Sequence, residues 1–135
     1  MKICTDIDQS INLVKSNILS IENADMYYPN RTGRYGINYA VPIEIKLGMN
    51  LLSQEIPAFS IDVLANLLPI YLFEFDRGID LSIYPNSNGK GWHVAYMPNN
   101  KVDLEKDSFR LISDGATLVD ALYEMVLKLH ELNLL

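Results

Sequence analysis

The chain has 135 residues, an apolar fraction of 49%, a charged fraction of 21% and a formal net charge of −6. This length and composition predict one globular domain with its own core and exclude a disordered chain. The eleven lysines and arginines are scattered along the chain, which disfavours nucleic-acid partners because phosphate binding needs clustered cations.

The first predicted element is an amphipathic helix from about Asp6 to Leu19. Its apolar residues recur at steps of four and three and share one helical face: Ile7, Ile11, Val14, Ile18 and Ile21. Thr5 is the expected N-cap, and Asp8 follows three residues later, as in a capping box.

A tyrosine-rich stretch comes next, "YYPNRTGRYGINY", from Tyr27 to Tyr39. Aromatic residues favour strands, and proline, asparagine and glycine favour turns, so the stretch predicts a hairpin with a loop at residues 30–34. Apolar and polar residues then alternate from Val41 to Leu47, which predicts a strand. Pro42 lacks an N–H group and places that strand at a sheet edge, and residues 48–58 are expected to be a connection.

A second series of elements begins at Ser60, the expected cap of a short helix that Pro69 stops. Alternation predicts strands over residues 71–75, 79–85 and 92–97, with a tight turn at 77–78 and a loop at 86–91. A further short strand is expected around Phe109 and Leu111. The last helix repeats its apolar residues from Leu118 to Leu132, and Thr117 with Asp120 forms a predicted capping box.

This order of elements predicts an α+β fold. We expect an antiparallel sheet of about four to six strands, with the C-terminal helix and the short helix packed on one face, plus the N-terminal helix. Residues 1–135 are expected to form a single domain. It would contain an N-terminal helix and tyrosine-rich hairpin over residues 1–55 and a helix–strands–helix unit over residues 56–135.

Residues with catalytic or metal-binding potential are few. The only histidines are His93 and His130, and with the single cysteine, Cys4, they lack the spacing of a zinc site. No nucleophile motif occurs, so we predict no catalytic residue, metal or cofactor. A helix–strands–helix order also occurs in double-stranded RNA-binding domains. Here, however, the last helix begins with "SDGATLVD", which carries two acids and no cation, and we reject that interpretation.

Two groups of aromatic residues are candidate contact surfaces. The first lies in the tyrosine-rich stretch, because tyrosine and arginine are enriched at interface hot spots: Tyr27, Tyr28, Arg31, Arg34 and Tyr35. An alternative is that alternate tyrosines of the stretch pack on the first helix while the others lie half-exposed. Another is that the stretch binds a nucleotide-like ligand, or serves an unrecognised enzyme, with Arg31 or Arg34 on a phosphate. The second group is Tyr84, Trp92 and Tyr96, if the outer face of the sheet is uncovered.

Three segments carry a family resemblance: "IPAFSIDVLANLLP" (56–69), "IDLSIYPNSNGKGWHVAYM" (79–97) and "LVDALYEMVLKLHELNLL" (118–135). Together they resemble a group of small uncharacterised proteins from prophages and mobile elements of gut anaerobic bacteria. The resemblance implies a context and a fold, and it implies no catalytic residues.

From the sequence we therefore expect a non-enzymatic protein-interaction module that binds a protein partner or a second copy of itself. The acidic balance suits a soluble protein or a basic partner. The single cysteine and the absence of a long apolar run predict a cytoplasmic protein without a membrane partner.

Overall fold

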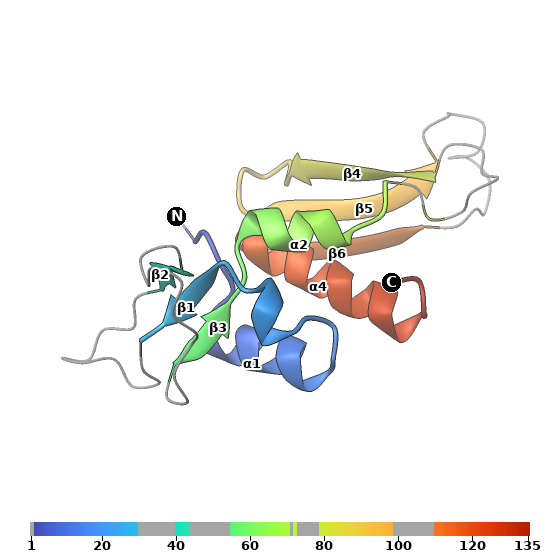
Figure 1. Ribbon diagram of the computed structural model, residues 1–135. Helices are drawn as coiled ribbons and strands as arrows, with labels where there is room; N and C mark the ends of the chain where they lie inside the picture. The colour runs from blue at the N-terminus through green and yellow to red at the C-terminus, as the bar shows by residue number, and fades with distance from the viewer. Residues whose placement is uncertain (1, 30–39, 44–54, 71, 73–78, 99–109) are drawn as a thin grey trace. The chain divides into compact units, whose positions relative to one another are not determined.

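The computed structural model describes residues 2–29, 40–43, 55–70, 72, 79–98 and 110–135 (Figure 1). These residues form helices and antiparallel strands, which confirms the α+β class. The chain divides into two compact units, Lys2–Val63 and Leu64–Leu135, and helix α2 (Ile61–Leu67) crosses the boundary between them. Within the described residues, no helix has the length and apolar character that a bilayer span requires.

The first unit contains helix α1 (Ile7–Lys15), the short 3-10 helix η1 (Ile21–Asn23) and a three-stranded sheet. The strands are β1 (Met26–Tyr28), β2 (Val41–Pro42) and β3 (Ile56–Ala58), in the order β2-β1-β3. Helix α1 packs against β3. A core cluster forms between the helix and the strands, with Ile7, Ile11 and Ala40 packed against five buried residues: Cys4, Met26, Tyr28, Ile56 and Ala58.

The boundaries of α1 differ from those predicted. The N-cap is Asp6 and not Thr5: Gln9 N donates to Asp6 Oδ1 at 2.8 Å, and Asp6 N donates to Gln9 Oε1 at 3.1 Å. Thr5 is fully buried and uses its hydroxyl elsewhere. The helix ends at Lys15, before the predicted Leu19, because Asn17 adopts a left-handed conformation with φ of 58°.

The tyrosine-rich stretch provides β1, the predicted first strand, while residues 30–39 lie outside the described part of the chain. Strand β1 pairs with β2 and β3, with Tyr27 opposite Val41 and Pro57. Within the described part of the chain, β2 is the outermost strand of this sheet, in agreement with the predicted edge position of Pro42. Residues 44–47 of the predicted strand lie outside the described residues. The predicted connection over residues 48–58 is wrong at its end, where residues 56–58 form β3.

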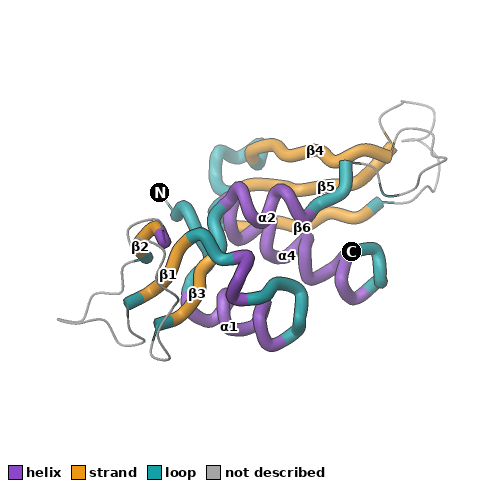
Figure 2. Tube along the Cα trace, viewed as in Figure 1, coloured by secondary structure: helices purple, strands orange, loops and turns teal. Residues whose placement is uncertain are grey.

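The second unit contains a sheet with the order β4-β5-β6, which α4 (Leu118–Glu131) covers on one face (Figure 2). Its strands are β4 (Ile79–Pro85), β5 (Trp92–Pro98) and β6 (Leu111–Gly115). The predicted hairpin with a loop at residues 86–91 is confirmed. The predicted strand at 71–75 and the turn at 77–78 lie almost entirely outside the described residues.

Helix α4 begins where the sequence predicts it. Thr117 Oγ1 accepts from Asp120 N at 3.2 Å, as an N-cap does. Ser113 Oγ on β6 donates to Ala121 O at 2.7 Å, which ties the helix to the strand. Gly115 permits this close approach, because a Cβ atom there would lie 2.3 Å from Ala121 N.

The described residues form six antiparallel strands, within the predicted range of about four to six, and these strands are divided between two three-stranded sheets. In the first sheet β1 has β2 on one edge and β3 on the other, so both of its edges are already paired. In the second sheet β5 has β4 and β6 as neighbours in the same way. Each central strand is thus flanked on both sides by strands of its own unit.

Candidate functional site

The residues predicted as a contact site fall into three places. Tyr27 and Tyr28 are buried in β1 of the first unit. Trp92 begins β5 in the second unit. Arg31, Arg34 and Tyr35 lie outside the described residues. Of the described members, only the two adjacent tyrosines occupy the same strand.

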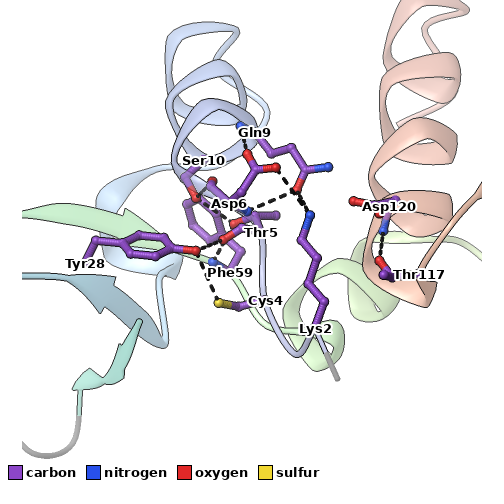
Figure 3. Close-up of polar contacts among 10 residues, drawn as sticks. All are labelled: Lys2, Cys4, Thr5, Asp6, Gln9, Ser10, Tyr28, Phe59, Thr117 and Asp120. Carbon is purple, nitrogen blue, oxygen red and sulfur yellow. Dashed lines mark hydrogen bonds and ion pairs between the residues drawn. The ribbon is translucent and has the colours of Figure 1, made fainter. Parts of the chain in front are cut away.

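Tyr28 belongs to a buried polar network rather than to an open surface (Figure 3). Its Oη donates to Thr5 O at 2.8 Å, and Cys4 Sγ lies 4.0 Å from the same Oη. Since the phenol proton goes to Thr5 O, the thiol is the donor to Tyr28. Burial raises the pKa of the Cys4 thiol, so Cys4 is a protonated core residue and not a reactive nucleophile.

The network continues through two fully buried hydroxyls, Thr5 and Ser10 (Figure 3). Phe59 N donates to Thr5 Oγ1 at 3.0 Å, and Ser10 Oγ donates to Asp6 O at 2.6 Å. The 2.7 Å contact between the two hydroxyls must then be donated by Thr5. Each of these buried donors has an acceptor, and the network joins the chain start to α1 and to the residue after β3.

The tyrosine hydroxyls predict an alkaline loss of stability. Burial raises the pKa of both Tyr28 and Tyr96 above the ordinary value of 10.0. The contribution of these two hydroxyls to the free energy of unfolding is therefore complete below pH about 10. It is lost as the pH rises through the folded-state pKa of each tyrosine.

We expect the free energy of unfolding to fall above pH about 10, by up to about 1.4 kcal/mol per pH unit for each tyrosine. Denaturant unfolding of the wild type and of Tyr96→Phe over this pH range measures the effect. The free energy of unfolding of the variant should fall less steeply with pH than that of the wild type. Equal slopes for the two proteins would contradict the assignment to Tyr96.

The predicted aromatic surface of Tyr84, Trp92 and Tyr96 is wrong, because these residues do not share a face. Trp92, Val94 and Tyr96 are two residues apart along β5 and therefore share one face, and Val94 lies opposite Ser113. Ser113 Oγ donates to Ala121 O of α4, so this is the helix-covered face. Tyr96 is fully buried there, and its Oη donates to Pro69 O at 2.6 Å. Tyr84 lies opposite His93, on the other face.

That other face carries a row of three side chains, one from each strand of the sheet. The register aligns Tyr84, His93 and Asp114. The Tyr84 and His93 rings lie with their centroids 5.1 Å apart and tilted by 38°. His93 Nδ1 contacts Asp114 Oδ1, so the carboxylate holds the imidazole in place. The next row is Ser82, Ala95 and Ile112. We call these six residues the outer face.

The outer face joins aromatic, apolar and acidic groups on a rigid sheet. Ile112 is 39% exposed, and Asp114 is also exposed. Within the described residues, no group of three or more histidine, cysteine, aspartate or glutamate side chains is placed to hold a metal ion. No pattern in the sequence pointed to the row of Tyr84, His93 and Asp114. Hairpin register combined with alternation could have found the pairing of Tyr84 with His93, but not the pairing with β6.

No protein-family model, curated protein or solved structure matches the chain. Its function is therefore inferred from the arrangement of its own residues. Among the described aromatic residues, Tyr84 and His93 combine partial exposure with a direct ring contact.

Proposed function

We propose that the chain is a non-enzymatic protein-interaction module that binds a basic protein partner through the outer face. The observation that supports this is the Tyr84–His93 ring pair beside the exposed Ile112. Large amphipathic side chains next to an apolar surface are typical of interface hot spots.

Restricted side-chain motion favours such a contact. Asp114 holds the His93 ring, and the ring packs against Tyr84. Side chains that are already ordered lose little conformational entropy on binding, so more of the contact energy contributes to affinity. Ala95 in the centre is small and fully buried, which leaves Tyr84 and Ile112 to provide the contact area.

The charge of the chain favours a basic partner. The formal net charge is −6, and the exposed Asp114 carboxylate lies at the β6 end of the aromatic row. Cationic groups at the rim of a partner would be steered toward this surface, with an association rate that falls as salt is added. The proposed setting is the cytoplasm of a bacterium that carries a mobile element, which rests on the sequence resemblance and on the single cysteine.

The test is affinity capture from a gut anaerobe lysate with mass spectrometry, comparing variants of the full chain. The wild type should enrich a basic protein that the double variant Tyr84→Ala, Ile112→Asp does not. Ile83→Asp is the matched control. Ile83 is 41% exposed on the same sheet but lies opposite Val94, on the helix-covered face.

Calorimetry with the purified partner then gives the affinity. We expect the double variant to weaken binding by at least about a hundredfold, and the control by less than about threefold. A double variant that binds as tightly as the wild type would overturn the proposal, as would a captured protein whose affinity does not change with salt.

A further inference from the structure

The imidazole of His93 has one nitrogen that the contacts within the sheet leave open. Nδ1 contacts Asp114 Oδ1, and a carboxylate oxygen only accepts hydrogen bonds, so Nδ1 carries the proton. In a neutral ring the other nitrogen, Nε2, then holds a lone pair and can only accept. No residue in the described part of the chain donates to Nε2.

This open nitrogen reaches solvent. The side chain of His93 is 21% exposed, and Nε2 is not one of the enclosed polar atoms that lack a partner in the described residues. Asp114 is 67% exposed, and its second oxygen, Oδ2, has no partner among the described residues. Because Nδ1 and Oδ1 are in contact, Nε2 and Oδ2 also lie close to each other. The outer face therefore presents two neighbouring acceptors.

We propose that His93 Nε2 and Asp114 Oδ2 together bind an arginine side chain of the partner. This assignment, which rests on the proposed function, names the chemical group by which the outer face recognises its basic partner. A guanidinium carries several N–H donors in a fixed planar fork. One N–H donates to Nε2 and a second to Oδ2, and the carboxylate supplies the opposite charge.

Arginine fits this site better than lysine does. The lysine ammonium is a compact and strongly hydrated point charge, which gains most of its interaction from the carboxylate alone. A guanidinium also packs its flat face on aromatic rings, and the Tyr84 ring lies in the same row, in contact with His93. An acidic group of a partner would instead meet Asp114 as a like charge.

The position of the imidazole proton tests the first step without any partner. Nitrogen NMR spectra of the histidine-labelled full chain at about pH 8, where histidine side chains are ordinarily neutral, distinguish the two tautomers. We expect His93 to carry its proton on Nδ1, and we expect Asp114→Ala to remove this preference. A wild-type ring with its proton on Nε2 would overturn the proposal, because Nε2 could not then accept.

Oligoarginine and oligolysine peptides of equal length test the choice of donor. The arginine peptide should bind the wild-type chain about tenfold more tightly than the lysine peptide and should shift the Nε2 resonance of His93. His93→Phe keeps a ring beside Tyr84 but lacks both nitrogens. It should weaken the arginine peptide about tenfold and change the affinity of the lysine peptide by less than about threefold.

His130→Phe is the matched control, since His130 is the other histidine and is exposed on α4. This variant should bind both peptides within about threefold of the wild type. Equal binding of the two peptides, or a His93→Phe chain that binds the arginine peptide as tightly as the wild type, overturns the proposal. Either result leaves capture of a basic protein by the outer face standing. A lysate that yields no basic protein overturns the proposed function, whatever the peptides do.

Discussion

Replacing Leu122 by alanine is expected to lower the free energy of unfolding by about 2–5 kcal/mol, the largest effect we predict. Leu122 is fully buried in α4, among seven buried residues of that helix. The helix packs on β5 and β6. Removing a fully buried side chain from it takes away apolar burial and leaves a cavity in the core. Denaturant unfolding followed by circular dichroism and by Trp92 fluorescence measures the change.

Glu124→Ala is the control for this experiment. Glu124 lies two residues away on the exposed side of α4, and its replacement should change stability by less than about 0.5 kcal/mol. If Leu122→Ala cost as little as Glu124→Ala, α4 would not be docked on the sheet, and the separation of the sheet into a covered face and an outer face would be wrong.

Thr5→Val should destabilise the protein by about 2–4 kcal/mol, although the two side chains have nearly the same shape. Thr5 Oγ1 accepts from Phe59 N and contacts Ser10 Oγ, and all three residues are fully buried. A valine leaves the Phe59 N–H without its acceptor. It also removes the hydroxyl that donates to Ser10 Oγ. The cost of leaving a buried polar group unpaired exceeds the net value of the bond itself.

Thr5→Ser distinguishes the hydroxyl from the methyl group. Serine keeps the hydroxyl, so the expected loss is about 1 kcal/mol, which is the value of one buried methyl. Chemical denaturation of the three proteins gives both values. If Thr5→Ser destabilised more than Thr5→Val, packing rather than hydrogen bonding would explain the role of Thr5.

The elements of the second unit could be predicted because their signals are local. Each signal lies within a few residues of the element that it determines. Examples are the apolar period of α4, its N-cap Thr117 and the loop at residues 86–91 of the β4–β5 hairpin. At the chain start, Thr5 and Asp6 are both good caps, and the choice depends on Phe59, which Thr5 reaches across the fold. No local pattern could decide between them.

The candidate sites were harder to predict for the same reason. The sequence does not distinguish a tyrosine that anchors a partner from one that is buried in a polar network. Tyr28 is of the second kind, since it contacts Cys4 and Thr5. Tyr27 and Tyr28 are both buried, whereas the alternative interpretation expected one of two neighbouring tyrosines to be half-exposed. The outer face depends on the register of β6 against β5, which brings Asp114 to His93.

Two isoleucines on opposite faces of the second sheet allow the most direct test of partner binding through the outer face. Ile112 and Ile83 are 39% and 41% exposed, and β5 separates them. Methyl NMR spectra of the isoleucine-labelled chain, recorded while the captured partner is added, report on both faces at once. We expect the Ile112 methyl resonance to shift or broaden while that of Ile83 stays in place. A response at Ile83 with none at Ile112 would contradict this expectation.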